Sequence, residues 1–309
     1  MCRLTRHLPS TAPIAMSAHP PIAPLAGVRI LSLSLNLPGP AALMRCRQMG
    51  AECAKLEPPP PPGRGSSDPM GIYCPEAYTT MHAGVRVLHA NLKAPEGQAL
   101  MAAELAQTDV LLTSFRPSAL AKLGLSWEAL QARHPRLSLV RIVGSPGAAA
   151  EEPGHDLTYM AQVGLVTGTA LPPTLFADMG GALMASEAVL QSQLARAQTG
   201  LGSCIDVALS EAAAWLGLPR RWGLTTAQGD VGGSHAGYRV YPCADGRVAL
   251  AALEPHFAAR LFTLVQLPPQ SDPHAPDVHE AAAAWLRGKS RQELDAIAGE
   301  QDLPLYTMA

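Results

Sequence analysis

The sequence predicts an α/β protein with a parallel sheet in its first part. The first observation is a β-α-β unit: an apolar segment at 27–35, a helical pattern at 39–51 and a second short strand pattern at 52–59. The second is that strand and helix patterns go on alternating up to residue 144. The third is a change to a hairpin and helices after Gly229.

The remaining elements of the large domain follow the same logic. Residues 58–71 contain a proline run and turn formers, so a loop is expected there. Strands are expected at 85–92, 109–115 and 136–144, and helices at 94–108 and 116–135, the latter broken near Gly124. In such a sheet the loops at the carboxyl ends of the strands form the natural ligand site.

The second half of the chain begins with a long helix expected from Gly180 to Arg196. A turn, a strand and a helix follow within 199–216, and a hairpin turns at Asp245–Gly246. The tail reads as mostly helical. The expected organisation is a disordered leader at 1–26, in which Met16 is an alternative start, a large domain at 27–228 and a small domain at 229–309, with the linker at 229–237.

Composition excludes several classes of protein. Of the 309 residues 16% are charged and the net charge is −2, which gives no footprint for nucleic acid. No apolar run approaches the roughly 20 residues that span a bilayer. None of the six cysteines forms a CxxC pair or lies near a histidine at zinc-ligand spacing, so free thiols in a reducing cytoplasm and no metal site are expected. Phosphate-loop, dinucleotide and G-x-S-x-G motifs are missing.

Three acid/base groups stand at boundaries between elements. His155 follows a Pro-Gly turn, Asp178 lies between an apolar run and two glycines, and Glu254 ends a strand before Pro255. Each also has a structural interpretation. His155 would be a helix cap or a buried core histidine, Asp178 the N-cap of the helix after it, and Glu254 a surface carboxylate. Spacing alone leaves both interpretations open.

Nine segments of the chain, in order, resemble the family III CoA transferases, which include the 2-methylacyl-CoA racemases. They are GVRILSLSLNLPGP, GAECAKLEPP, NLKAPEG, DVLLTSFRPSALAKLGL, HPRLSLVRI, PGHDLTYMAQVGL, ADMGGALMA, ARAQTGLGSCIDVALSEAA and YRVYPCADGRVALAALEPHF. The resemblance implies a large Rossmann-like domain on the parallel sheet and a smaller α+β domain. It also implies an enzyme that acts on acyl-CoA thioesters without a metal or redox cofactor, usually as an interlaced homodimer. It makes Asp178 the reactive carboxylate, His155 a second base and Glu254 the support of His155.

The resemblance also suggests residues that bind the substrate. Arg64, Arg86, Arg116 and Tyr159 are candidates for contacts with CoA or the acyl group. Inversion next to a thioester passes through an enolate, whose oxygen needs hydrogen-bond donors. Backbone N–H groups at the start of the helix after Asp178, freed by Gly180 and Gly181, are the expected donors.

Three functions remain open. The transferases usually carry tyrosine where this chain has His155, and ALEPHF also favours the racemases, so racemase-like proton transfer is preferred over CoA transfer through an aspartyl-CoA intermediate at Asp178. The third is a non-catalytic acyl-CoA-binding paralogue, because Leu35, Ala83 and Val85 replace basic residues that the family usually carries. The chain is also shorter than typical members, so the small domain is expected to be truncated.

Overall fold

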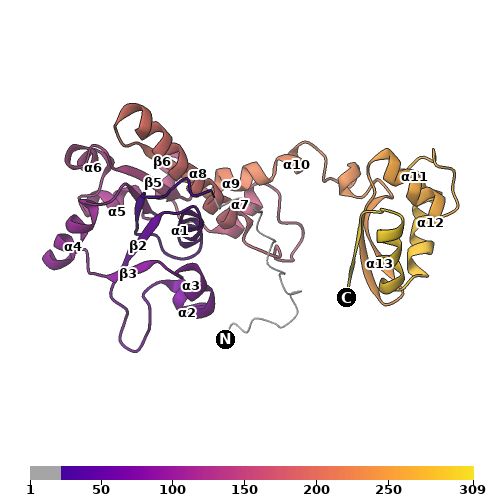
Figure 1. The fold of residues 1–309 in the computed structure, drawn as a ribbon, viewed down its shortest axis with the longest axis horizontal. Coiled ribbons are helices and arrows are strands. Elements are labelled where there is room, and N and C mark those ends of the chain that lie inside the picture. The colour runs from indigo at the N-terminus through magenta and orange to yellow at the C-terminus, as the bar shows by residue number, and fades with distance from the viewer. Residues whose placement is uncertain (1–21) are drawn as a thin grey trace. The chain divides into compact units, whose positions relative to one another are not determined.

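A computed structural model of the chain describes residues 22–309. It divides into two compact units, with the boundary in the chain between Leu216 and Gly217 (Figure 1). Residues 217–228, assigned to the large domain from the sequence, thus belong to the second unit, whereas the linker was expected at 229–237. Within the described part of the chain, no helix combines the length and apolar character that crossing a membrane requires.

The first unit contains a six-stranded sheet in the order β3-β2-β1-β4-β5-β6, with every neighbouring pair parallel. The strands are β1 (Arg29–Ser32), β2 (Glu52–Glu57), β3 (Arg86–His89), β4 (Val110–Thr113), β5 (Ser138–Val143) and β6 (Cys204–Ala208). This confirms the predicted parallel sheet. The order reverses between β1 and β4, and such a point is where ligands bind in open α/β sheets.

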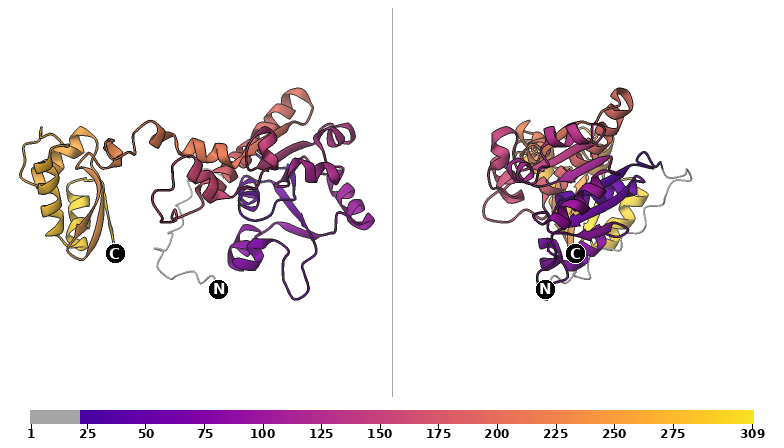
Figure 2. Two further views of the ribbon diagram at one scale, coloured as in Figure 1. Left: turned by 180° about the vertical axis from the view of Figure 1, so that it is seen from behind. Right: turned by 90° about the vertical axis from the view of Figure 1, so that its left-hand side faces the viewer.

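Helices cover both faces of this sheet (Figures 1 and 2). Alternate strand residues face opposite sides: Ile30 and Val110 belong to one core cluster, and Leu31 and Leu111 to the other. The first cluster includes residues of α1 (Pro38–Gln48), α7 (Asp156–Gln162), α8 (Phe176–Thr199) and α9 (Leu209–Leu216). The second includes residues of α4 (Pro95–Leu105), α5 (Pro117–Lys122) and α6 (Trp127–Arg133).

Two details correct the sequence-based outline. Leu25 is fully buried and its N–H bonds to the carbonyl of Met49 at 2.9 Å, so the packed chain begins before residue 27. The rest of the expected leader, up to residue 21, lies outside the described residues. The expected loop at 58–71 ends in α2 (Pro69–Tyr73), and α3 (Pro75–Met81) follows it. Both are short helices with proline at the first position; the Asp68 side chain caps α2, and Cys74 stands at the N-cap position of α3 without a side-chain hydrogen bond.

The second unit packs helices against a three-stranded antiparallel sheet. The strands are β7 (Tyr238–Cys243), β8 (Gly246–Ala251) and β9 (Leu305–Met308), and the helices in this core are α11 (Pro255–Leu264), α12 (Pro276–Arg287) and α13 (Arg291–Glu300). The short α10 (Leu218–Arg221) precedes them and buries none of its residues. The hairpin predicted at Asp245–Gly246 is confirmed. The tail is mostly helical, as expected, and its last residues form β9, which pairs with β8 and completes the sheet.

Candidate active site

A cavity of about 470 Å³ opens at the carboxyl edge of the large sheet. Segments that follow β1, β4 and β5 form its floor, and the starts of α7 and α8 complete it. It is lined by Leu35, Asn36, Pro38, Tyr73, Ser114, Phe115, Arg116, Ile142, Val143, Gly144, Ala150, Glu152, Gly154, His155, Asp156, Leu157, Tyr159, Leu175, Asp178 and Leu209. The structure therefore brings His155 and Asp178, 23 positions apart in the chain, into one cavity.

His155 stands at the N-cap position of α7 with an exposed side chain. The backbone makes the local contacts: the His155 N–H donates to Thr158 Oγ1 at 3.1 Å, and that hydroxyl donates to the His155 carbonyl at 2.7 Å. The interpretation as a buried core histidine is thus wrong, because the side chain is exposed. His155 thus occupies the N-cap position of α7 and also lines the cavity.

Asp178 is the third residue of α8, and Leu175 holds the N-cap position. The N-cap interpretation is therefore wrong. The Asp178 N–H donates to Asp156 Oδ1 at 3.0 Å. The pKa of Asp178 is raised to about 6, mainly by burial and then by the negative charge of Asp156, while His155 acts in the opposite direction. A carboxyl group that titrates near neutrality exists in both protonation states under ordinary conditions, as a proton-transfer group requires.

Gly180 and Gly181 serve packing. A Cβ on Gly180 would lie 3.0 Å from Leu216 Cδ1, and one on Gly181 would lie 2.3 Å from Leu209 Cδ2, so the glycines let α9 approach α8. Because α8 begins at Phe176, their N–H groups fall where α-helical hydrogen bonds are already made. The expectation that these N–H groups are free for an oxyanion is therefore wrong.

Tyr159 projects from α7 into the cavity and is 4% exposed. Its hydroxyl fills the space beside two glycines: a Cβ on Gly144 or on Gly154 would lie 2.2 Å from Tyr159 Oη. Burial raises the pKa of the phenol, and the negative charge of Asp178 adds to this. The hydroxyl therefore stays protonated and can donate a hydrogen bond. Its contact with substrate stays a prediction.

The three candidate arginines lie in different places. Arg116 lines the cavity at the turn into α5. Arg64 is exposed in the loop after β2 and does not line the cavity. Arg86 is the first residue of β3 and lies at the amino ends of the strands, away from the carboxyl ends where the cavity opens. Its guanidinium donates to both carboxylate oxygens of Glu104, at 3.0 and 2.7 Å. The structure thus brings Arg116 to the cavity, and Arg64 and Arg86 not.

Glu254 belongs to the second unit. It is exposed and stands at the N-cap position of α11, where its carbonyl accepts the N–H groups of Phe257 and Ala258 at 2.9 Å each. Its support of His155 stays a prediction.

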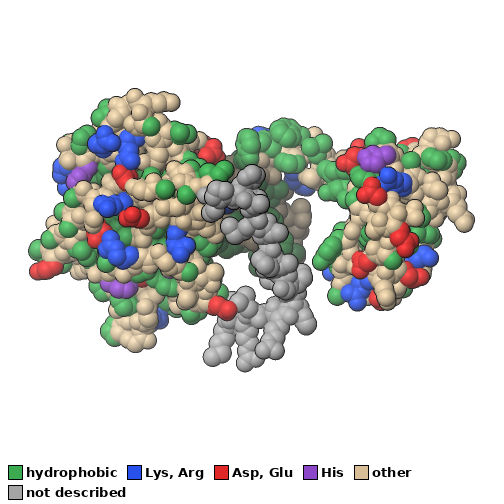
Figure 3. All heavy atoms as spheres, in the orientation of Figure 1, with side chains coloured by type: hydrophobic (Ala, Val, Ile, Leu, Met, Phe, Trp, Pro, Cys, Tyr) green, Lys and Arg blue, Asp and Glu red, His purple; other side chains and the backbone are tan. Residues whose placement is uncertain are grey.

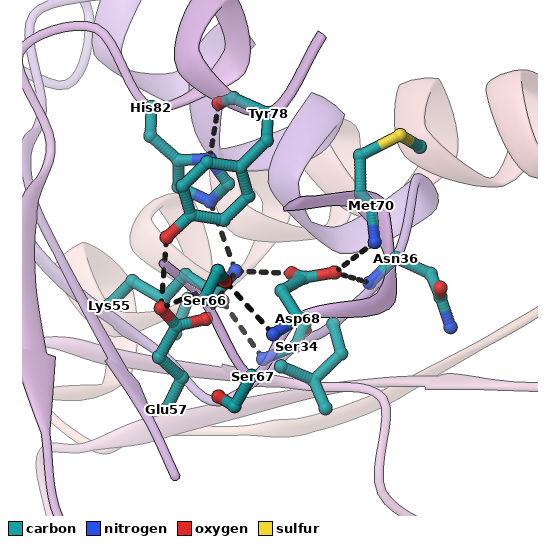
Figure 4. Close-up of polar contacts among 12 residues, drawn as sticks. Ser34, Asn36, Lys55, Glu57, Ser66, Ser67, Asp68, Met70, Tyr78 and His82 are labelled. Atoms are coloured by element: carbon teal, nitrogen blue, oxygen red, sulfur yellow. Dashed lines mark hydrogen bonds and ion pairs between the residues drawn. The ribbon is translucent and has the colours of Figure 1, made fainter. Parts of the chain in front are cut away.

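Sequence reasoning missed a buried polar cluster beside the cavity, centred on Lys55 (Figure 4). Lys55 Nζ lies 2.5 Å from Asp68 Oδ2, 3.1 Å from His82 Nε2 and 3.5 Å from Glu57 Oε2, and its side chain is fully buried. Tyr78 donates its hydroxyl to Glu57 Oε1 at 2.9 Å. The available signal was a lysine within the otherwise buried pattern of β2, since a buried charge needs a partner.

His82 completes the cluster as a neutral acceptor. Its Nδ1 lies 2.7 Å from the carbonyl of Tyr78, so Nδ1 carries the proton and Nε2 offers a lone pair to Lys55. Burial lowers the pKa of His82, and the positive charge of Lys55 lowers it further. Lys55 Nζ thus has hydrogen-bond partners in Asp68 and His82, whereas Glu57 Oε2 lies at ion-pair distance without a hydrogen bond.

The cluster reaches the cavity through Asp68. Asp68 Oδ1 accepts the N–H of Met70 at 2.9 Å, which caps α2, and the N–H of Asn36 at 3.0 Å. Asn36 has a φ of 65°, in the left-handed region. The Tyr73 hydroxyl donates to Asn36 Oδ1 at 3.3 Å. Asn36 and Tyr73 both line the cavity, so the buried ion pair is one hydrogen bond away from its wall.

A second, smaller cavity of about 160 Å³ lies at the carboxyl ends of β2 and β3. It is mainly apolar and is lined by Leu56, Glu57, Pro58, Ala90, Asn91, Leu92, Lys93, Phe115 and Leu123. Phe115 borders both cavities.

The described cysteines are Cys46, Cys53, Cys74, Cys204 and Cys243, and all five are free, as predicted for them. Cys2 lies outside the described residues. Burial raises the pKa of Cys46 and of Cys53 to about 12, so neither is a thiolate near neutral pH.

The chain is similar in sequence to known proteins of one family. The sequence model described as CoA-transferase family III matches residues 25–308. A succinyl-CoA–D-citramalate CoA-transferase from Chloroflexus aurantiacus is 29% identical, over 94% of this chain and 81% of that protein. An alpha-methylacyl-CoA racemase from Homo sapiens is 30% identical over 75% of this chain, and the match spans 62% of the racemase, less than two thirds of its length.

Solved structures show the same fold. The crystal structure of a hypothetical protein from Mycobacterium tuberculosis has a TM-score of 0.78 at 23% identity, covering 93% of this chain and 84% of that one. A CAIB/BAIF family protein from Brucella suis has a TM-score of 0.73 at 24% identity, with coverage of 93% and 84%. The predicted fold class is thereby confirmed.

Proposed function

This chain belongs to CoA-transferase family III, and we propose that it epimerises the α-carbon of a 2-methylacyl-CoA by proton transfer between Asp178 and His155. The observation that carries the proposal is the joint position of these two groups in one cavity, together with the pKa of about 6 at Asp178. Epimerisation needs one group that removes the α-proton and another that returns a proton to the opposite face. Histidine is the residue type suited to proton transfer near neutral pH, and the pKa of Asp178, about 6, makes that carboxyl group suited to it as well.

CoA would extend from the large cavity into the smaller one. The thioester belongs beside His155 and Asp178, and the apolar hollow beyond Phe115 offers a place for the adenine. Arg116 on the first cavity and Lys93 on the second supply cations for the phosphates between the two ends.

A second candidate is CoA transfer between an acyl-CoA and a carboxylic acid. The similarity to the citramalate transferase favours it, as does the half-buried carboxylate of Asp178. In that reaction the carboxylate attacks the thioester carbonyl and the C–S bond breaks, which gives a mixed anhydride and free CoA thiolate. The thiolate then displaces the acyl carboxylate and forms an aspartyl-CoA thioester, from which CoA passes to the second acid.

We also propose that the protein works as a homodimer. Trp215 and Trp222 are 70% and 65% exposed, and large contiguous exposed apolar patches mark interaction surfaces. Hydrophobic side chains gather around α10, as Figure 3 shows. Sedimentation velocity tests the proposal, and a monomer at micromolar concentration would contradict it.

Incubation of the protein with (2R)-2-methylacyl-CoA in D₂O, followed by mass spectrometry, tests the main proposal. We expect deuterium at the α-carbon with the wild type and none with His155→Ala or Asp178→Ala. Glu187→Ala, which removes an exposed carboxylate from the same helix as Asp178, serves as the control and should retain exchange.

Absence of exchange in the wild type would refute epimerisation. Supplying carboxylic acids as acceptors then tests CoA transfer, for which an adduct of CoA at Asp178 is expected. Binding of acyl-CoA with neither activity would leave the non-catalytic paralogue.

A further inference from the structure

The cavity needs a donor for the thioester oxygen. Negative charge develops on this oxygen both when the α-proton leaves and when a carboxylate attacks the carbonyl carbon, so the need is common to both candidate reactions. The N–H groups of Gly180 and Gly181 lie inside α8 and are already used.

We propose that the side-chain amide of Asn36 donates a hydrogen bond through Nδ2 to the thioester oxygen of the bound acyl-CoA, and that Tyr73 positions it. The proposal rests on the proposed action on CoA thioesters, and it holds for either reaction. Asn36 follows β1, at the carboxyl edge of the sheet, and lines the same cavity as His155 and Asp178.

The backbone of Asn36 is held firmly. Its φ of 65° lies in the left-handed region, which residues other than glycine seldom adopt. Asparagine is among the non-glycine residues found there most often. Asp68 Oδ1 accepts the Asn36 N–H at 3.0 Å, and Asp68 is itself fixed by the fully buried Lys55 (Figure 4). A donor fixed in advance stabilises developing charge without reorganising during the reaction.

The side chain is oriented by Tyr73. The Tyr73 hydroxyl donates to Asn36 Oδ1 at 3.3 Å, so the oxygen end is engaged and the Nδ2 end remains for a ligand. Burial raises the pKa of Tyr73, and the negative charges of Asp68 and Asp178 raise it further, so the phenol stays a donor. Tyr73 and Asp178 line the same cavity.

A neutral amide suits this position. A lysine or arginine beside Asp178 would lower the pKa of that carboxyl, whereas Asn36 supplies a donor without a charge. The charged and titratable groups that line the cavity with Asp178 are Tyr73, Arg116, Glu152, His155, Asp156 and Tyr159. Of these, Asp156 raises the pKa of Asp178 and His155 lowers it.

The test uses acetoacetyl-CoA, whose acidic α-carbon gives an enolate that absorbs in the near ultraviolet. A donor to the thioester oxygen raises the enolate fraction of the bound probe. Asn36→Gly removes the amide and accepts the left-handed backbone, and Asn36→Asp keeps the shape but loses the donor. Gln191→Ala, which removes an exposed amide from α8, is the matched control.

We expect the wild type and Gln191→Ala to raise the enolate fraction equally. In Asn36→Gly and Asn36→Asp the ratio of bound enolate to bound keto form should fall by about 100-fold, the typical effect of one oxyanion donor. The affinity for butyryl-CoA, which carries no such charge, should change little in Asn36→Gly. Tyr73→Phe should lower the enolate ratio by a smaller factor, again with unchanged butyryl-CoA affinity, a pattern that mere loss of structure would not produce.

Two results would overturn the inference, and they have different consequences for the proposed function. If the Asn36 variants raise the enolate fraction as much as the wild type does, the donor lies elsewhere and the proposed function stands. If the wild type binds neither CoA ester, the proposed function fails and the inference fails with it.

Discussion

Replacing Asp156 by asparagine should lower the pKa of Asp178. Asp156 is 5% exposed, and its Oδ1 accepts the Asp178 N–H at 3.0 Å. Asparagine retains an oxygen for this hydrogen bond and removes the negative charge. The substitution therefore separates the electrostatic effect of Asp156 from its role in joining the starts of α7 and α8.

The size of the effect follows from the causes of the raised pKa. The pKa of Asp178 rises from 3.8 to about 6, with burial as the larger cause and Asp156 as the second. Asparagine leaves the burial in place. We therefore expect the pKa to fall to about 5, a change of about one pH unit or 1.4 kcal/mol.

The assay is carbon-13 NMR of protein labelled at aspartate, with the Asp178 signal assigned by its loss in Asp178→Asn. The exposed Asp277, in the first turn of α12, gives the matched control, and Asp277→Asn should leave the Asp178 midpoint unchanged. Where Asp178 acts as the base, the acid limb of deuterium exchange should move to lower pH by the same amount. An unchanged or raised Asp178 midpoint in Asp156→Asn would refute the electrostatic reasoning.

Three further predictions concern stability, each read from urea unfolding. Because the pKa of Asp178 is raised on folding, the folded state binds more protons than the unfolded state between pH 3.8 and about 6, so this group destabilises the fold as pH rises through that range. Asp178→Asn should therefore abolish activity yet stabilise the protein by about 1–3 kcal/mol at pH 7.5 and by much less at pH 4; equal effects at both pH values would contradict this. Lys55→Met leaves Asp68 and Glu57 buried without their cation and should cost about 3–5 kcal/mol, whereas Arg86→Met breaks a pair whose arginine is 53% exposed and should cost at most about 1 kcal/mol. Similar losses in the two variants would show that Lys55 is not the anchor of its cluster. Gly181→Ala places a Cβ 2.3 Å from Leu209 Cδ2 and should destabilise by about 1–3 kcal/mol, while Gly299→Ala in α13 meets no neighbour and should stabilise by up to about 1 kcal/mol; the reverse order would contradict the packing role of Gly181.

The sequence predicted the sheet well because the strands are short apolar segments bounded by turn-forming residues. Val110–Thr113 is wholly buried. In the sequence it is a short apolar segment between two helical patterns, and its length indicates a strand. β9 was missed for the opposite reason. Its residues, Leu305–Met308, follow the helices of the tail and become a strand through pairing with β8, whose residues lie 55 to 61 positions earlier.

The site shows a similar limit. His155 and Asp178 were located as boundary residues, and the fold supplied their meeting in one cavity. The two glycines were misread because the start of α8 carries no N-cap signal: Leu175 holds that position without a side-chain hydrogen bond. The Lys55–Asp68 pair joins a strand to a loop 13 positions away, and no local pattern encodes such a contact.

The hydroxyl of Tyr159 constrains the evolutionary paths open to the cavity, because it couples the residues permitted at three positions. If phenylalanine replaced Tyr159, the atom nearest to a Cβ at Gly144 would be Cζ at 3.2 Å, a distance that slight relaxation accommodates. At Gly154 the ring itself would still lie 2.6 Å away. Alanine at 144 is therefore accessible only after the hydroxyl has been lost, and a side chain at 154 only after the ring has gone. The order in which these substitutions arise decides which of them a lineage can survive.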